Sequence, residues 1–345
     1  MTFKVRIVQP GRTIEVSPRA FLLHAALAAG IDYPFGCQSG NCGACKSRLL
    51  EGEVAMAGYS DFALGDDERA RGLFLACRAV ARADSRIAWL EEDDVVTHPR
   101  RTLQCRVTAL DDATHDIKRV RLAIESDGPL AFSAGQFASV TFGDCPPRDY
   151  SMANVPGDPM LEFHVRRTAS GGASAHVAER LAVGHSVRVE GPFGTSHLRE
   201  SHRGPIVAVA GGSGLAPIKS IVEHALALGL PQPIHLYFGV RERRDLYLHD
   251  HFAGLAERHA NLRFVPVLSE GADTDLRRGL VHEAAAADLA DLDGCMAYLA
   301  GPPAMVEAAT LLFERRGMRR DDIHADAFYT AAEMARAGRK TGAEM

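Results

Sequence analysis

Four cysteines near the start of this 345-residue chain constrain its structure more than any other feature. Four residues separate Cys37 from Cys42, two separate Cys42 from Cys45, and 31 separate Cys45 from Cys77. Thiolates at this spacing can hold a [2Fe–2S] cluster, since one tight loop supplies three ligands while a distant segment supplies the fourth. The glycines between these cysteines would let backbone N–H groups approach the sulfur atoms. We therefore predict that the four cysteines bind a [2Fe–2S] cluster.

Two other interpretations of these cysteines stay open on the sequence alone, a structural zinc site and unrelated free thiols. Zinc sites more often contain two Cys-x2-Cys pairs. The other three cysteines, Cys105, Cys145 and Cys295, lie far apart, and we expect them to be inert thiols. An odd total of seven cysteines without a secretory signal favours reduced thiols and metal ligands over disulfides.

The composition argues against several classes of protein. Hydrophobic residues make up 46% of the chain and charged residues 24%, as in ordinary globular proteins of two to three domains. A net charge of −5 with no basic stripe argues against a nucleic-acid partner. No apolar run reaches the roughly 18 residues of a membrane-spanning helix, and the first residues lack the pattern of a signal peptide. We expect a monomeric cytoplasmic protein without membrane attachment.

The chain divides into regions of different pattern. Residues 1–98 open with two short strand-like runs and close with an acidic run typical of a connection between domains. Residues 99–202 contain short alternating runs typical of a small antiparallel barrel. Residues 203–330 repeat an apolar strand, a turn and a helix, which is typical of a doubly wound parallel sheet. The polar residues 331–345 are predicted to form a flexible tail.

A short segment at the end of one barrel strand combines groups that suit a flavin. Arg148 offers a guanidinium for phosphate, Tyr150 an aromatic face for a planar ring, and Ser151 a hydroxyl for a ring nitrogen. Further along, a glycine turn opens a predicted helix, where backbone N–H groups and the helix dipole would hold a pyrophosphate. The further candidates in this region are His164, Val165, Arg166, Gly171, Gly172 and Ser174.

A second glycine-rich turn is typical of a site for the phosphates of a dinucleotide. Gly211, Gly212, Ser213 and Gly214 follow the apolar run 206–210 and precede a helix with apolar periodicity. A strand before the turn and a helix after it are the context that phosphate binding requires. An ordinary flexible turn is the alternative.

Two later segments would complete this site. Gly301 and Pro302 stand at the end of another predicted strand and form its second element. Arg241 begins the segment that should meet the adenosine ribose, where an acidic residue favours a free 2′-hydroxyl and an arginine favours a 2′-phosphate. This chain offers both, in the order Arg241-Glu242-Arg243-Arg244-Asp245. The residues alone thus leave NADH and NADPH open.

Taken together, these motifs resemble those of a ferredoxin–NAD(P)H reductase fused to an N-terminal plant-type ferredoxin domain. The chain is most similar to the reductase components of Rieske aromatic-ring-hydroxylating oxygenases of the naphthalene dioxygenase kind, over about residues 3–330. The matching segments are Val96-Thr97-His98-Pro99, Thr114-His115-Asp116-Ile117, Arg148-Asp149-Tyr150-Ser151-Met152 and Ala325-Asp326-Ala327-Phe328-Tyr329. The resemblance implies a multidomain α+β and α/β fold. Its parts would be a β-grasp ferredoxin domain at 1–98, a six-stranded antiparallel FAD-binding β-barrel at 99–202 and a doubly wound NAD(P)-binding domain at 203–330.

The resemblance also implies roles for individual residues. Tyr150 would pack on the isoalloxazine ring of FAD, Ser151 would hydrogen-bond near its N5 atom, and Arg148 would bind its phosphates. Phe328 would shield the second flavin face until nicotinamide displaces it. A cysteine usually stands where this chain has Ala300. NADH would be preferred, with NADPH tolerated. The residues that would complete the FAD site are Arg166, Gly172 and Ser174.

The implied function is electron transfer from NADH through FAD and the [2Fe–2S] cluster to a Rieske oxygenase component or an intermediate ferredoxin. A hydride carries two electrons whereas the cluster accepts one at a time, and a flavin converts between them because it can hold two, one or none. A similar reductase for a di-iron monooxygenase or a deoxysugar dehydrase is the nearest alternative. An iron–sulfur redox sensor without turnover is an alternative of another class.

Overall fold

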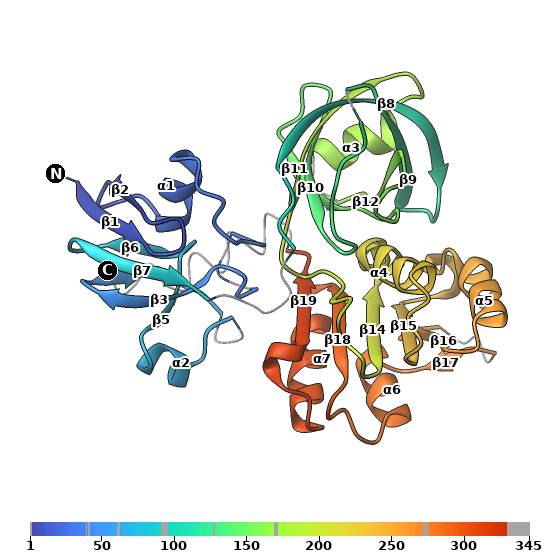
Figure 1. Cartoon of the computed structure of the whole chain (residues 1–345). Coiled ribbons are helices and arrows are strands. Elements are labelled where there is room, and N and C mark those ends of the chain that lie inside the picture. The colour runs from blue at the N-terminus through green and yellow to red at the C-terminus, as the bar shows by residue number, and fades with distance from the viewer. Residues whose placement is uncertain are drawn as a thin grey trace. The chain divides into compact units, whose positions relative to one another are not determined.

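The computed structural model describes residues 2–38, 40, 42–60, 63–90, 96–126, 128–168, 172–271 and 275–329. Contacts divide the described chain into two compact units, the first formed chiefly by residues 2–90 and the second by Val96–Phe328 (Figure 1). The predicted tail at 331–345 lies outside the described residues. Each unit is described here by itself.

The first unit is a mixed sheet with a short helix, as the predicted β-grasp domain requires. Its elements are β1 (Phe3–Ile7), β2 (Arg12–Val16), α1 (Leu22–Ala28), β3 (Lys46–Glu51), β4 (Val54–Met56), α2 (Asp66–Ala70), β5 (Leu73–Leu75), β6 (Ala79–Ala81) and β7 (Ser85–Trp89). The main sheet has the order β2-β1-β7-β3-β5, in which β1 and β7 are parallel. Val5 and Ile7 alternate with exposed residues on β1, so one face of the sheet forms the core.

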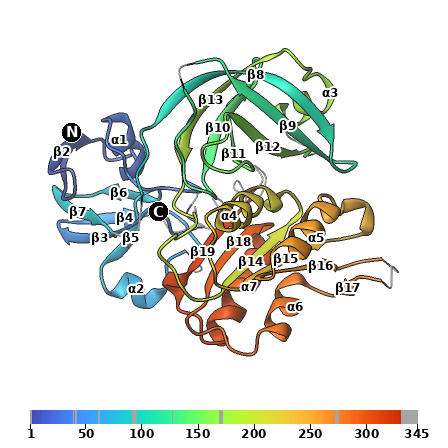
Figure 2. The same ribbon diagram turned by 45° about the vertical axis from the view of Figure 1, so that its right-hand side comes forward.

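The second unit begins with an antiparallel six-stranded sheet that nearly closes into a barrel (Figure 2). Its elements are β8 (Arg101–Asp112), β9 (Ile117–Ile124), β10 (Phe137–Phe142), β11 (Arg148–Ser151), β12 (Met160–Arg166), α3 (Gly172–Glu179) and β13 (Ser186–Phe193). The order β11-β10-β13-β8-β9-β12 leaves β11 and β12 at the edges. A single isolated bridge between Met152 and Phe163 joins these edges at the seam. The predicted barrel is confirmed.

The rest of the second unit is a parallel six-stranded sheet covered by helices on both faces (Figure 2). Its elements are β14 (Ile206–Gly211), α4 (Leu215–Ala227), β15 (Ile234–Val240), α5 (His249–Arg258), β16 (Leu262–Leu268), β17 (Arg277–Arg278), α6 (Val281–Asp288), β18 (Met296–Gly301), α7 (Pro303–Arg315) and β19 (Ile323–Ala327). The order is β17-β16-β15-β14-β18-β19, so the direction of strand addition reverses between β14 and β18. Ligands of such sheets bind at the carboxyl ends of the strands at this reversal.

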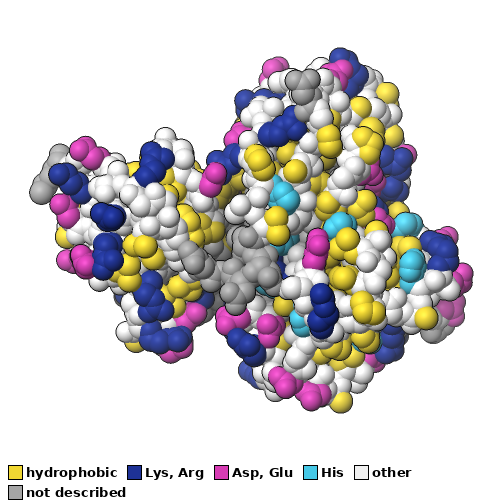
Figure 3. Space-filling model, in the orientation of Figure 1, with side chains coloured by type: hydrophobic (Ala, Val, Ile, Leu, Met, Phe, Trp, Pro, Cys, Tyr) yellow, Lys and Arg dark blue, Asp and Glu magenta, His cyan; other side chains and the backbone are white. Residues whose placement is uncertain are grey.

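The surface of the described residues is mixed in character. Lys and Arg side chains are interspersed with Asp and Glu over the face shown in Figure 3. None of the helices in the described part of the chain is both long enough and apolar enough to cross a membrane.

Candidate functional site

The cluster loop brings the four predicted cysteine ligands together in the first unit. The Cys37 N–H donates to Cys42 Sγ at 3.3 Å, and the Cys77 N–H donates to Cys45 Sγ at 3.4 Å. The Cys77 thiol also interacts with those of Cys45 and Cys37, and the Cys42 thiol with those of Cys37 and Cys45. A Cβ atom at Gly36 would lie 3.0 Å from Cys42 Sγ, so glycine lets the backbone come this close.

The arrangement of the sulfur atoms distinguishes a two-iron cluster from a single zinc ion. Four thiolates on one zinc ion would lie about 3.8 Å apart, as follows from a Zn–S bond of about 2.3 Å in a tetrahedron. Among the described residues, no three cysteines have sulfur atoms that all lie within 4.8 Å of one another. The thiol–thiol hydrogen bonds instead pair Cys37 with Cys42 and Cys45 with Cys77. Two such pairs fit a [2Fe–2S] cluster, in which each iron binds two thiolates.

The predicted flavin residues lie on β11, at the seam of the barrel. The half-buried Tyr150 ring packs edge-on against Phe142, with ring centroids 5.8 Å apart. Burial raises the pKa of Tyr150 to about 12, opposed in part by Arg148, so the phenol stays neutral at physiological pH. Ser151 is buried, and its hydroxyl donates to Asp326 Oδ2 at 3.3 Å. Arg148 is exposed on the same strand. The strand thus carries a ring, a hydroxyl and a cation within four residues.

The start of α3 offers the predicted site for a pyrophosphate. A Cβ atom at Gly172 would meet no atom within 4 Å, so the helix begins beside open space. The Ser174 hydroxyl accepts a hydrogen bond from the Thr168 N–H at 3.1 Å. Ser174 therefore shapes the turn, and the backbone N–H groups of the first helical turn are the donors suited to an anion. Gly171 lies outside the described residues.

Three of the predicted flavin residues lie on strand β12, namely His164, Val165 and Arg166. Side chains alternate along a strand, and Val165 points with Leu161 and Phe163 into the barrel core. The His164 side chain is fully buried and bonded to other side chains. Protein atoms therefore enclose both side chains, and a contact of these two residues with FAD stays a prediction. Arg166 lines the cavity of the parallel-sheet domain instead of the barrel.

Glu162 is the centre of a buried polar cluster between the barrel and the parallel-sheet domain. Its Oε1 lies 2.9 Å from His164 Nε2 and 3.8 Å from Lys219 Nζ, and its Oε2 lies 3.4 Å from the Arg119 guanidinium. Burial raises the pKa of Glu162, but the hydrogen bond from His164 and the charges of Lys219 and Arg119 lower it by more. The pKa of Glu162 therefore lies well below its usual value, and the carboxylate stays charged.

We expect Glu162→Gln to destabilise the second unit at neutral pH and to do so less in acid. Glutamine removes the charge that pairs with Lys219 and Arg119, and the loss of one partner of a buried ion pair costs about 3–5 kcal/mol. Because the native pKa of Glu162 is depressed, this stability is present above the unfolded pKa of about 4.3 and is lost as the pH falls below it. Urea unfolding of wild type and variant should differ most near pH 7, and the difference should begin to shrink as the pH falls below about 4. A difference that does not change with pH would contradict the charged cluster.

A cavity of about 450 Å³ opens at the carboxyl ends of the parallel strands, where the strand order reverses. Gly211 and Pro302 both line it, so the two predicted nicotinamide segments meet there. Backbone contacts hold these segments together. A Cβ atom at Gly214 would lie 2.1 Å from the Ala300 carbonyl oxygen, and one at Gly301 would lie 2.8 Å from the Gly211 carbonyl oxygen. A side chain at either position would push β14 away from β18.

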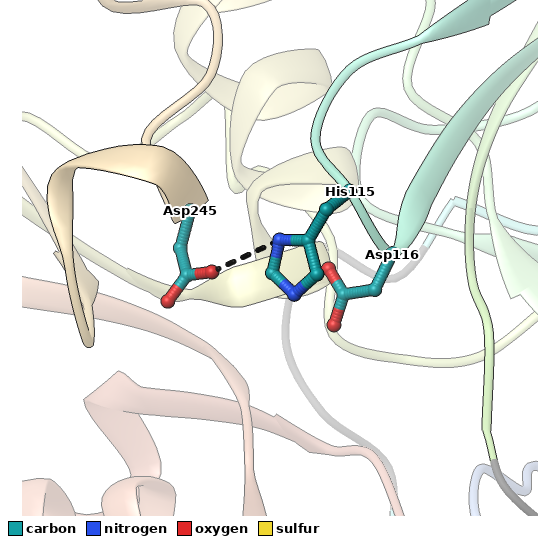
Figure 4. A group of neighbouring side chains, drawn as sticks. All are labelled: His115, Asp116 and Asp245. Carbon is teal, nitrogen blue, oxygen red and sulfur yellow. Dashed lines mark ion pairs between the residues drawn. The ribbon is translucent and has the colours of Figure 1, made fainter.

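Charged side chains from both parts of the second unit meet at this cavity (Figure 4). His115 and Asp116 lie in the turn between β8 and β9, and His115 Nδ1 is 3.5 Å from Asp245 Oδ1. Arg166 Nε donates to Asp116 Oδ2 at 2.8 Å, and Arg241 Nε lies 3.4 Å from Asp245 Oδ2. His115, Asp116 and Asp245 are close enough together to hold a metal ion. Since arginines already pair with both carboxylates, we assign these aspartates to the lining of the cavity.

Three family models match the chain in succession. They are the 2Fe-2S iron-sulfur cluster binding domain at residues 5–82, the oxidoreductase FAD-binding domain at 104–198 and the oxidoreductase NAD-binding domain at 208–310. Over 310 residues the chain is 44% identical to the ferredoxin–NAD(P)(+) reductase component of the naphthalene 1,2-dioxygenase/salicylate 5-hydroxylase systems of a Ralstonia species, which covers 89% of this chain and 93% of that protein. The chain belongs to the ferredoxin–NAD(P)(+) reductase components of oxygenase systems.

Two further comparisons agree with this assignment. The reductase is 38% identical over 325 residues to the corresponding component of the Pseudomonas putida naphthalene 1,2-dioxygenase system, covering 94% of this chain and 98% of that protein. The crystal structure of an Amycolatopsis cytochrome P450 reductase superimposes with a TM-score of 0.77 at 39% identity, covering 96% of this chain and all of the other. These matches confirm the predicted fold class, the oxidoreductase activity and the three cofactors, and they do not favour a redox sensor without turnover.

Two more predicted residues of the reductase lie beside the nicotinamide segments. Phe328 directly follows β19, and its N–H donates to the Gly301 carbonyl at 2.9 Å. Ala300, where this family usually has a cysteine, is buried at the end of β18. Ser213 is half-buried within the turn between β14 and α4. The structure thus gathers the turn, the second element and Phe328 at one end of the parallel sheet.

Sequence reasoning missed several residues that line the cavity of the reductase. They include Asp116, His282 and Met305. Asp116 and Arg166 pair across 50 residues of sequence, Asp116 from the turn before β9 and Arg166 from the end of β12. No local pattern marks such a pair, because the fold alone brings its members together.

Proposed function

We propose that this reductase takes a hydride from NADH and delivers the electrons singly to a Rieske-type aromatic-ring-hydroxylating oxygenase, or to a ferredoxin that serves it. The observation that carries the choice of partner is the 44% identity, over 89% of the chain, to a reductase component named for naphthalene dioxygenase and salicylate hydroxylase systems. Reductases named for an aromatic O-demethylase and for phenol 2-monooxygenase are 40% and 38% identical to it. The oxygenases for which these two reductases are named are the competing candidates for the partner.

The residues of the barrel fit FAD. When bound, FAD exchanges a hydride with nicotinamide and single electrons with an iron–sulfur cluster. Tyr150 would contact its ring system, and Arg148 would bind its phosphates together with the start of α3. The Ser151 hydroxyl donates its proton to Asp326, so its oxygen lone pairs remain for a hydrogen-bond donor of the cofactor. Gly211, Gly212 and Pro302 would hold the nicotinamide dinucleotide.

The charges after β15 support a preference for NADH. Each arginine of this segment pairs with an acidic side chain. The pairs are Arg241 with Asp245, Arg243 with Asp275 and Arg244 with Glu242. A 2′-phosphate would have to displace a carboxylate, whereas a ribose hydroxyl can donate to one. The pairs on the surface are individually weak, but all three carboxylates repel a phosphate.

Purified reductase tests the proposal directly. It should show flavin and cluster absorbance, and kcat/KM for NADH should exceed that for NADPH by about tenfold or more. With NADH it should support turnover of a Rieske oxygenase, with or without an added ferredoxin, faster than turnover of a di-iron hydroxylase or a cytochrome P450. Faster turnover of either of the latter would contradict the proposed partner. Absence of flavin absorbance would contradict the proposed function as a whole.

A further inference from the structure

Strand β12 turns three polar side chains toward the parallel-sheet domain. Glu162, His164 and Arg166 alternate with residues of the barrel core and so share one face of the strand. Glu162 pairs with Lys219 and His164 hydrogen-bonds to Tyr247, both in the neighbouring domain. Arg166 lies next to Gly212, since a Cβ atom there would be 3.0 Å from the guanidinium. One strand of the flavin barrel therefore contacts both α4 and the glycine turn that precedes it.

Helix α4 is also bound to the segment that follows the flavin residues. Lys219 Nζ donates to the Ala153 carbonyl at 2.9 Å, and the Ser220 hydroxyl donates to the Asn154 carbonyl at 2.7 Å. Both donors are buried. Ala153 and Asn154 follow closely after Ser151, and α4 begins directly after the glycine turn. The turn is thus fixed on one side to the segment next to the flavin strand.

The hydrogen bond between His164 and Tyr247 fixes the other side of the turn. His164 Nδ1 lies 2.8 Å from the Tyr247 hydroxyl, and Nε2 lies 2.9 Å from Glu162 Oε1. Burial lowers the pKa of His164, and Glu162 opposes this only in part, so the imidazole is neutral and carries one proton. A carboxylate can only accept, so the proton sits on Nε2 and Nδ1 accepts the hydroxyl proton of Tyr247. Glu162 thereby sets the direction of the whole chain of hydrogen bonds.

Tyr247 and Arg166 stand on either side of Gly212. The Tyr247 oxygen lies 3.5 Å from the Gly212 carbonyl oxygen. A Cβ atom at Gly212 would lie 3.0 Å from the Arg166 guanidinium, and its φ of +55° favours glycine. Because the Tyr247 proton goes to His164, its approach to the Gly212 carbonyl is a van der Waals contact, and the second glycine of the turn packs against one side chain of the barrel and one that the barrel orients.

We propose that His164 and Tyr247 are positioning residues for hydride transfer, which fix the nicotinamide turn relative to the flavin strand. This rests on the proposed function, because it concerns transfer between those two cofactors. A displaced turn would still bind NADH through its backbone, but a misplacement of about 1 Å can slow a reaction up to about 100-fold. Apolar side chains would hold the two domains together without the cost of burying a carboxylate. A chain of hydrogen bonds also fixes the orientation of one domain relative to the other.

The test compares Tyr247→Phe with Tyr237→Phe in the full-length protein carrying FAD and its cluster. Each substitution deletes one hydrogen-bonded hydroxyl from a buried tyrosine. The Tyr237 hydroxyl donates to Asp288 Oδ2 on α6 at 3.1 Å, away from β12. Anaerobic stopped-flow absorbance gives the limiting rate of flavin reduction and the dissociation constant of NADH. In Tyr247→Phe we expect a limiting rate about tenfold lower and a dissociation constant within about twofold of wild type. Tyr237→Phe should keep both wild-type values.

A second readout does not depend on turnover. Addition of NAD⁺ to the chemically reduced protein changes the long-wavelength absorbance when nicotinamide stacks on the flavin, and this change should weaken in Tyr247→Phe alone. Should that variant fail to fold, His164→Gln provides the same test. Its amide can still donate to Glu162 but offers Tyr247 no ring nitrogen.

The outcomes separate the two proposals. An unchanged limiting rate in Tyr247→Phe, or an equal loss in both tyrosine variants, would overturn the positioning role while leaving the proposed function intact. Failure of NADH to reduce the flavin of the wild-type protein would overturn the proposed function, and the positioning role with it.

Discussion

In Cys42→Ser we expect reduction of cytochrome c by NADH to fall about 100-fold or more, while reduction of ferricyanide stays within about twofold of wild type. A serine hydroxyl does not replace the soft thiolate that iron–sulfur clusters require. Cys42 lies in contact with Cys37, so its loss leaves one iron with a single thiolate. Ferricyanide is small and can take electrons directly from the flavin, whereas a protein acceptor depends on the cluster. Iron content and visible absorbance report the loss independently of activity.

Cys295→Ser is the matched control for this prediction. Cys295 is a buried free thiol of the parallel-sheet domain, outside the cluster loop. Iron content and both activities should match those of wild type. Undiminished cytochrome c reduction in Cys42→Ser would show that electrons leave the protein without passing through the cluster.

Gly214→Ala should lower the rate of flavin reduction by NADH about 100-fold, with FAD and iron content unchanged. The added Cβ atom would lie 2.1 Å from the Ala300 carbonyl oxygen, a distance at which the backbone must move. Movement there separates the glycine turn from the second nicotinamide segment. Reduction by dithionite bypasses the nicotinamide site and should remain normal. A variant that NADH reduces at the wild-type rate would contradict the assignment of this turn.

Gly254→Ala on α5 controls for the substitution itself. The new Cβ atom would meet only the flexible end of Arg258, at 3.2 Å. Alanine in a helix interior is more favourable than glycine by about 0.5–1 kcal/mol. This variant should therefore keep the wild-type rate of flavin reduction and unfold at a slightly higher temperature.

The parts of the site that lie within one loop could be predicted from the sequence. Three of the cluster ligands sit on one short loop, so their spacing is itself the geometric constraint. The glycine turn before α4 was predictable for the same reason, because its strand, turn and helix are consecutive. The alternation of apolar residues likewise indicated the barrel, since one side of each strand fills its core. The predicted domain boundaries at 98 and 202 remain predictions.

The role of the polar face of β12 could not be predicted in this way. Alternation shows that Glu162, His164 and Arg166 point away from the barrel core, but it does not show what covers them. Lys219 and Tyr247 pack over these side chains, and they lie more than 50 residues later in the chain. Long-range docking of this kind leaves no periodic trace in the sequence.

The single bridge between Met152 and Phe163 has a thermodynamic consequence. The strand with the flavin residues and the strand that docks the parallel-sheet domain share the sparsest hydrogen bonding of the barrel. Each strand is instead fixed directly to the parallel-sheet domain, β11 through Ser151 and Asp326 and β12 through His164 and Tyr247. By reciprocity, tighter domain docking raises the affinity for FAD by the same factor by which FAD strengthens docking. The link runs through Ser151, which is proposed to meet the flavin and also bonds to Asp326 of the other domain.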